Sequence, residues 1–144
     1  MTEELKIENE LHSELHSAIL HSTMDFASTR AVANRKALLA LMAALRIEED
    51  VIRLGGGTKA AEAQHGKGRL AARERLHLLL DEGTEFVELG LWAAHGMYAE
   101  YGGAPSAGVV TGLGRVSGRL CMIVANDATV KAGAFFPMTA KKVL

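Results

Sequence analysis

The sequence of 144 residues contains one cysteine, Cys121, so an intramolecular disulfide bond is excluded. Disulfide frameworks belong to oxidising compartments, and their absence favours a reducing one. Cys121 lies in the apolar run LCMIVA. We therefore interpret it as a small core residue rather than a nucleophile.

The chain also lacks an excess of charge of either sign and a long apolar run. Its 16 basic residues balance 17 acidic ones, which gives no reason to expect a nucleic-acid partner or an anionic membrane. The longest apolar run, Ala37 to Leu45, is far short of the roughly 20 residues that a bilayer needs. The acidic start, MTEELKIENE, is unlike a secretory signal or a mitochondrial presequence. These features predict a cytoplasmic protein.

Clear metal-ligand spacing is missing as well. His12 and His16 are four residues apart and would share a helix face, but no Glu follows His12 and no third ligand is evident. His65, His77 and His95 form no cluster with the spacing of a metal site. We predict no metal in this chain.

What is present begins with a long helix that carries an apolar stripe. Its apolar residues recur at helical spacing: Leu38, Leu41, Met42, Leu45 and Ile52. Gly55 to Gly57 are predicted to end this helix, since glycine tolerates the left-handed conformation of a helix terminus. We interpret the stripe as an ordinary packing face.

Shorter elements are predicted after the glycines. A helix over about Ala71 to Leu80 is expected to close at Gly83, and Phe86 to Leu89 is expected to form a strand. The run AEYGGAPSAG predicts a loop, because glycine and proline interrupt regular structure.

The C-terminal part predicts a hairpin followed by a helix. GVVTGLGRVSGRLCMIVAND is typical of two strands joined by a tight turn at Ser117 and Gly118. The second strand, Leu120 to Ala125, has no polar alternation, so both of its faces are expected to be buried in an α/β core. Pro137 fits the first turn of a helix that runs on to Leu144.

Two glycine-containing motifs do not predict a nucleotide site. HGKG, from His65 to Gly68, lacks both the earlier glycine and the following Ser or Thr of a phosphate loop. GLGRVSG has misspaced glycines and precedes a strand where a dinucleotide-binding motif needs a helix.

Two further features have open interpretations. Arg69 and Arg73 lie four apart in the basic run GKGRLAARER, so on a helix they would either bind one phosphate group together or form a solvated face. The small residues Ala132, Gly133 and Ala134 allow a close approach to the backbone, and a tight turn needed only for packing is the favoured interpretation from these residues alone.

Two blocks of the sequence resemble a known family. The first is GGGTKAAEAQHGKGRLAARERLHLLLDEGTEFVEL, and the second is GVVTGLGRVSGRLCMIVANDATVKAGAFFPMTAKK. Both are similar to the carboxyltransferase (β) subunits of biotin-dependent acyl-CoA carboxylases, most of all to the methylcrotonyl-CoA carboxylase branch. The resemblance covers most of the chain from about Phe26 onward.

The resemblance implies an α/β crotonase-like fold, preceded by a helical segment. Residues 1–57 would form this helical segment, and residues 58–144 would begin the N-terminal carboxyltransferase domain of a subunit several times longer. We therefore expect an N-terminal fragment that is inactive alone. The alternative is a short, non-catalytic paralogue whose helical N-terminus, Leu38 to Ile52, docks on a full-length carboxylase subunit as an interaction module.

The implied reaction transfers a carboxyl group from carboxybiotin to 3-methylcrotonyl-CoA or a similar branched, unsaturated acyl-CoA, as in leucine degradation. Backbone N–H groups of Ala132, Gly133 and Ala134 would stabilise the thioester enolate. The phosphates of CoA would be bound by Arg69, Arg73, Lys141 and Lys142. Biotin would be carried by a biotin carboxylase or biotin carrier subunit, and other carboxyltransferase subunits would be further partners.

This sequence departs from the family pattern at a few positions. The family usually has Arg-Gly-Lys-Leu where this chain has Lys67, Gly68, Arg69 and Leu70. At Ala132 or Ala134, or both, the family usually has glycine, and an aromatic pair that is often Tyr-Tyr corresponds to Phe135 and Phe136. These changes preserve the backbone donors but alter the fit of a ligand.

Overall fold

The computed structural model describes residues 22–144, so the expectation for His12 and His16 falls outside the described residues. The chain divides into two compact units, residues 1–40 and 41–144, with the division inside the long helix α2 (Thr29–Arg53). The sequence-based domain boundary at residue 57 stays a prediction. No helix within residues 22–144 is long and apolar enough to cross a membrane.

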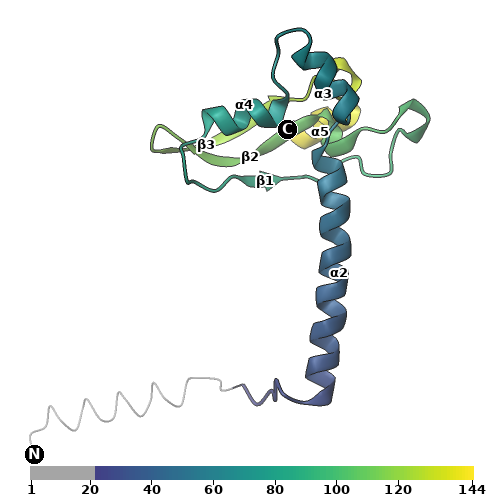
Figure 1. Ribbon diagram of the computed structural model, residues 1–144, viewed down its shortest axis with the longest axis vertical. Coiled ribbons are helices and arrows are strands. Elements are labelled where there is room, and N and C mark those ends of the chain that lie inside the picture. Colours follow the sequence, from purple (N-terminus) through teal and green to yellow (C-terminus); the bar gives the residue numbers. More distant parts are fainter. Residues whose placement is uncertain (1–21) are drawn as a thin grey trace, which may run out of the picture. The chain divides into compact units, whose positions relative to one another are not determined.

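Most of the predicted elements are confirmed (Figure 1). After α2 come two short helices, α3 (Thr58–His65) and α4 (Ala72–Leu79). The strands are β1 (Val87–Leu89), β2 (Val109–Val116) and β3 (Arg119–Asn126), and α5 (Pro137–Val143) follows with proline in its first turn. The predicted loop between β1 and β2 contains two short 3₁₀ turns, Ala99–Tyr101 and Pro105–Gly108.

The three strands form one antiparallel sheet in the order β1-β2-β3. The predicted hairpin joins β2 to β3, with left-handed φ angles of 50° at Ser117 and 77° at Gly118. Asp81 holds this turn, because its two carboxylate oxygens accept the N–H groups of Ser117 and Gly118, each at 2.6 Å. The loop after α4 and the hairpin are therefore tied together.

One face of the sheet is covered by α4. Its buried residues Ala72 and Leu76 pack with Val110 of β2 and Ile123 of β3 to form the core of this unit. Two glycines of β2 lie on the same face and leave room for larger neighbours. A Cβ atom at Gly112 would lie 2.5 Å from the Phe86 ring, and one at Gly114 would lie 2.3 Å from Leu80 Cδ2.

The opposite face of the sheet is open over β3 and β1, although Val109 and Thr111 of β2 are buried there, and this corrects the prediction that both faces of the second strand are buried. Leu120, Met122 and Val124 of β3 are 66%, 60% and 49% exposed, and Val87 and Leu89 of β1 lie exposed on the same face. The apolar run was compatible with burial on both sides, but among residues 22–144 nothing covers the side chains of Leu120, Met122 and Val124. We call these five residues the open sheet face.

The apolar stripe on α2 is also mostly exposed. Leu38, Leu41, Met42 and Leu45 are more than a third exposed, and only Ile52, near the C-terminal end of the helix, is buried. Ile52 belongs to the unit that holds the sheet. Packing of the stripe as a whole therefore stays a prediction.

Candidate functional site

A left-handed turn follows β3 and contains two of the three predicted oxyanion donors. Lys131, Ala132 and Gly133 have φ angles of 49°, 54° and 79°. Only glycine adopts such angles without cost, so the surrounding structure must hold the other two residues in place. The N–H of Gly133 donates to Val130 O at 2.9 Å, and that of Ala134 donates to Lys131 O at 3.0 Å.

These two bonds leave one predicted donor available. The N–H of Ala132 donates in none of the backbone hydrogen bonds found between residues 22 and 144, and Ala132 is exposed. Gly133 and Ala134 use their N–H groups to close the turn itself. Of the three predicted donors, Ala132 is therefore the one that can donate to a bound oxygen atom without breaking the turn.

The segment before this turn is anchored from several sides. We call residues 127–130 the anchor segment. The buried Asp127 accepts hydrogen bonds from Thr129 N at 2.9 Å and from Thr129 Oγ1 at 2.6 Å, both on Oδ1. The N–H of Asp127 donates to Gly108 O at 2.9 Å, and the N–H of Gly56 donates to Thr129 Oγ1 at 2.9 Å.

A second left-handed turn, at Ser106, Ala107 and Gly108, leads into β2 with φ angles of 51°, 54° and 68°. Helix α5 holds it. The Thr139 hydroxyl donates to Ala107 O at 2.8 Å. Lys142 Nζ donates to Ser106 O at 3.0 Å, to Ser106 Oγ at 2.6 Å and to Val109 O at 2.6 Å.

These contacts use all three N–H bonds of the Lys142 ammonium group. Lys142 is half-buried, and the loss of hydration lowers its pKa to about 8, with the positive charge of Arg73 acting in the same direction and the negative charge of Glu88 opposing it. Lys142 therefore ties α5 to the start of β2 rather than pointing a free cation into solvent.

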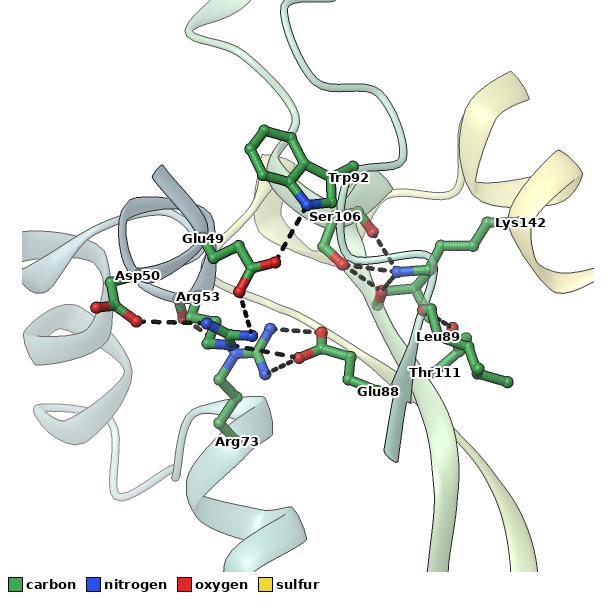
Figure 2. A network of polar contacts seen from close by, with 11 residues as sticks. Glu49, Asp50, Arg53, Arg73, Glu88, Leu89, Trp92, Ser106, Thr111 and Lys142 are labelled. Atoms are coloured by element: carbon green, nitrogen blue, oxygen red, sulfur yellow. Dashed lines mark hydrogen bonds and ion pairs between the residues drawn. The ribbon is translucent and has the colours of Figure 1, made fainter. Parts of the chain in front are cut away.

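Arg73 is also paired within the chain (Figure 2). Its guanidinium donates to both oxygens of Glu88, at 2.8 and 2.7 Å, and to Arg53 O at 3.0 Å. The Glu88 side chain is only 10% exposed. Since this pair is bidentate and mostly shielded from water, it joins α4 to β1 and to the end of α2.

The end of α2 extends this polar network. Arg53 pairs with Glu49 at 3.1 Å and with Asp50 at 3.3 Å, and Glu49 also accepts a hydrogen bond from the Trp92 indole at 3.4 Å. Figure 2 shows these side chains converging around the end of α2. The network therefore fixes the C-terminal end of α2, which Gly55 and Gly56 follow in the chain.

Arg69 and Lys141 are exposed, unlike Arg73 and Lys142. Arg69 precedes α4 rather than lying on it, so it does not share a helix face with Arg73. It lines a shallow depression of about 410 Å³ together with Gln64, Arg75 and Ala128. The structure thus groups Arg69 with Arg75, a pairing that helical spacing from Arg69 did not predict.

The neighbouring Glu74 has a local role. It accepts the N–H of Ala71 at 2.7 Å at the start of α4 and contacts His65 Nε2 at 2.8 Å. These two hydrogen bonds hold the pKa of Glu74 below its ordinary value, and the bond with His65 has the larger effect. Within the described part of the chain, no group of three or more His, Cys, Asp or Glu side chains is placed to hold a metal ion.

A mostly apolar cavity of about 600 Å³ lies between the last turns of α2 and the loop before β2. Ile52, Leu91, Ala94, Met97 and Ser106 are among the residues that line it. None of the predicted oxyanion or CoA residues is among them. The cavity and the turn after β3 are therefore separate features.

Comparison with known proteins assigns this arrangement to a family. A sequence model described as the carboxyl transferase domain matches residues 63–144, more than half of the chain. The chain belongs to the carboxyl transferase domain family. The resemblance inferred from the sequence is thereby confirmed.

Two relatives of this carboxyl transferase domain are methylcrotonyl-CoA carboxylase subunits. The probable mitochondrial methylcrotonoyl-CoA carboxylase beta chain of Drosophila melanogaster is 45% identical over 126 residues, which cover 88% of this chain and 22% of the relative. The biotin-dependent 3-methylcrotonyl-coenzyme A carboxylase beta1 subunit of Mycobacterium tuberculosis is 54% identical over 91 residues, covering 63% of this chain and 17% of the relative.

The crystal structure of the geranyl-CoA carboxylase beta subunit of P. aeruginosa is similar as well. It has a TM-score of 0.73 and 30% sequence identity, over 85% of this chain and 22% of that chain. This carboxyl transferase domain chain thus spans about a fifth of the length of these relatives. The mixed helix and sheet architecture agrees with the predicted α/β class.

The carboxyl transferase domain does not bring all its predicted site residues together. Arg73 and Lys142 serve the network around Glu88, whereas Ala132, Gly133 and Ala134 lie beyond the anchor segment. Sequence reasoning missed Asp127 and Thr129. The pattern Asp-Ala-Thr after a strand was the available signal, since Asp side chains often accept the N–H of the residue two positions later.

The lowered pKa of Lys142 gives a testable pH dependence. Folded Lys142 loses its proton near pH 8, whereas the unfolded chain keeps it up to the ordinary value of 10.5. Between these values the native state binds fewer protons than the unfolded state, so the free energy of unfolding should rise with pH. Urea unfolding of the dilute chain between pH 7 and 10, followed by the fluorescence of Trp92, the only tryptophan, measures this.

The comparison is made with Lys142→Met and with Lys141→Met. The Lys142→Met chain should lack the increase above pH 8, whereas Lys141→Met, which alters an exposed neighbour, should keep it. Parallel pH profiles for the wild-type chain and Lys142→Met would contradict the assignment.

Proposed function

We propose that this chain forms part of the carboxyltransferase component of a biotin-dependent acyl-CoA carboxylase. The acyl-CoA would be 3-methylcrotonyl-CoA or a similar branched, unsaturated thioester. The observation that carries the proposal is the 54% identity to the Mycobacterium tuberculosis 3-methylcrotonyl-coenzyme A carboxylase beta1 subunit. The similarity to the geranyl-CoA carboxylase beta subunit supports a branched, unsaturated acyl group.

The proposed chemistry places negative charge on the thioester oxygen. The thioester would lose a proton from a carbon conjugated with its carbonyl, and the electron pair would be delocalised onto the carbonyl oxygen. Carboxybiotin, when bound, would supply the carboxyl group to that carbon by cleavage of its N–C bond, and the released biotin nitrogen would take up the proton. The N–H of the exposed Ala132 would donate to the oxygen, where a donor of this kind is worth about 3 to 4 kcal/mol in the transition state. Gly133 and Ala134 would hold the turn that aims it.

The proposed phosphate contacts of CoA rest on the exposed cations. Arg69 shares a depression with Arg75, and Lys141 is exposed at the end of α5. Arg73 pairs with the Glu88 carboxylate and Lys142 donates to Ser106 and Val109, so both side chains are engaged within the chain. We therefore assign Arg69, Arg75 and Lys141 to the phosphates and give Arg73 and Lys142 the role of fixing the elements around them.

The crotonase-like fold and the assembly belong to the same proposal. The partners would be a biotin carboxylase or biotin carrier subunit, which delivers carboxybiotin, and other carboxyltransferase subunits. The relatives that are beta chains support this, as does the hexamer assembly of transcarboxylase 12S, a similar structure with a TM-score of 0.63 and 35% identity.

A chimaera tests the proposal. The matching stretch of the Mycobacterium tuberculosis beta1 subunit is replaced by this chain's sequence, and the assembled enzyme is assayed for fixation of labelled bicarbonate. We expect fixation that depends on 3-methylcrotonyl-CoA, with a smaller kcat/KM for propionyl-CoA. The parent enzyme is the control. A folded, assembled chimaera without acyl-CoA-dependent fixation would contradict the proposal.

The open sheet face favours a second candidate, the non-catalytic paralogue that docks on a full-length subunit. An exposed apolar surface of this kind commonly marks an interaction site. The same chimaera discriminates, because a docking module has no need of a competent oxyanion turn. Full activity of the chimaera would exclude this candidate.

A further inference from the structure

The turn at Lys131, Ala132 and Gly133 costs energy to hold. Two consecutive residues other than glycine have left-handed angles, which L-residues adopt only at a cost in free energy. Contacts outside the turn must compensate for this cost. The anchor segment, which precedes the turn directly, makes such contacts.

Thr129 is at the centre of the anchor segment. Its hydroxyl accepts the N–H of Gly56 at 2.9 Å and donates to Asp127 Oδ1 at 2.6 Å. A Cβ atom added to Gly56 would lie 1.9 Å from Thr129 O, so the two backbones are in direct contact. One hydroxyl group thus joins the end of α2 to the carboxylate that organises the anchor segment.

The connection continues to the turn through the backbone. The N–H of Val130 donates to Asp127 O at 3.1 Å, and the N–H of Gly133 donates to Val130 O at 2.9 Å. Val130 itself is only 3% exposed. Thr129 is therefore connected to Gly133 by a continuous series of hydrogen bonds and covalently adjacent residues.

We propose that Thr129 is a positioning residue, which acts through Asp127 and Val130 to hold the Ala132 N–H in its donating orientation. This inference rests on the proposed function for its catalytic meaning. The structural part of the inference does not depend on that function: the hydroxyl group of Thr129 sets the geometry of the turn. Thr129 itself does not touch the acyl-CoA.

The first test measures amide hydrogen exchange in the full chain. Thr129→Val keeps the shape of the side chain but removes the hydroxyl, and Thr129→Ser keeps the hydroxyl. We expect the Gly133 and Ala134 amides to exchange about tenfold faster in Thr129→Val, as loss of the part-buried hydrogen bond to Asp127 predicts, and at the wild-type rate in Thr129→Ser.

Thr84→Val is the matched control. The Thr84 hydroxyl also donates a hydrogen bond, to Asp81 O at 2.7 Å, in the loop that holds the far end of the hairpin. It should leave the Gly133 and Ala134 amides unchanged. Unchanged exchange in Thr129→Val would overturn the proposal, and so would faster exchange throughout β2 and β3, which would indicate general destabilisation. If Thr129→Val fails to fold, Thr129→Ala, which has no added methyl group, replaces it.

The second test uses the chimaeric carboxylase. Thr129→Val should lower kcat at least tenfold and change the KM for acyl-CoA less than twofold, while Thr129→Ser should restore kcat. A wild-type kcat per folded Thr129→Val enzyme would overturn the proposal. If the unsubstituted chimaera were inactive, the proposed function would fail, and the exchange measurement alone would decide whether Thr129 positions the turn.

Discussion

The isolated 144-residue chain is expected to self-associate, and three polar substitutions on β3 should make it monomeric. The open sheet face presents apolar side chains from two strands, of which Leu120 and Met122 are the most exposed. In addition, β3 is an edge strand, whose outer N–H and C=O groups can pair with another chain. The apolar face and the free edge therefore both promote self-association.

The test replaces Leu120 by Thr, Met122 by Lys and Val124 by Thr. These side chains point away from α4, so the substitutions reduce exposed apolar area and put a charge on the edge strand without altering the core. Analytical ultracentrifugation should show larger species for the wild-type chain and a monomer for the variant.

The control changes the other face of the same strand. Ile123→Thr, which faces α4, should weaken the core and increase association instead. A wild-type chain that sediments as a single monomer at tens of micromolar would contradict the role assigned to the open sheet face.

Gly56→Ala is expected to destabilise the chain strongly. The added Cβ atom would lie 1.9 Å from Thr129 O and 2.6 Å from Thr129 C. These are backbone atoms that cannot rotate away, so relief requires the end of α2 to separate from the anchor segment. Overpacking typically costs about 1 to 3 kcal/mol, and the contact with backbone atoms places Gly56→Ala at the upper end of this range.

Gly66→Ala provides the matched control. Gly66 has φ −59°, an ordinary helical value, and its added Cβ atom would meet only Glu62 O at 3.5 Å. We expect this change to be neutral or slightly stabilising, because alanine restricts the unfolded chain more than glycine does. Both substitutions are made in the monomeric variant and measured by urea unfolding. Equal midpoints for Gly56→Ala and Gly66→Ala would contradict the contact with Thr129.

Local signals were sufficient to predict most of the elements. The glycines after Arg53 mark the end of α2, Pro137 lies in the first turn of α5, and Ser117 with Gly118 forms the turn between β2 and β3. In each case the signal is the backbone preference of the residue itself, although distant partners such as Asp81 then stabilise the conformation. This is why sequence patterns predict such features.

The internal partners of the cations could not be predicted in the same way. Arg73 is 15 residues from Glu88, and Lys142 is 36 residues from Ser106. A basic residue in a sequence carries no sign of whether its partner is a ligand or a carboxylate from another element. The burial of β3 failed for a related reason, because an apolar strand shows what it can bury and not which layers are present.

The two glycines of β2, which carry no side chain, restrict the register in which the strands can pair. On the covered face, Val110, Gly112, Gly114 and Val116 alternate with residues that point to the opposite face, and the two glycines lie under Phe86 and Leu80. A slip of β2 by two residues would place a valine where the Phe86 ring or Leu80 needs space. A slip by one residue would turn Thr111 and Leu113 inward. Misaligned hairpins are thus disfavoured by side-chain volume, through contacts that involve no residue downstream of β3.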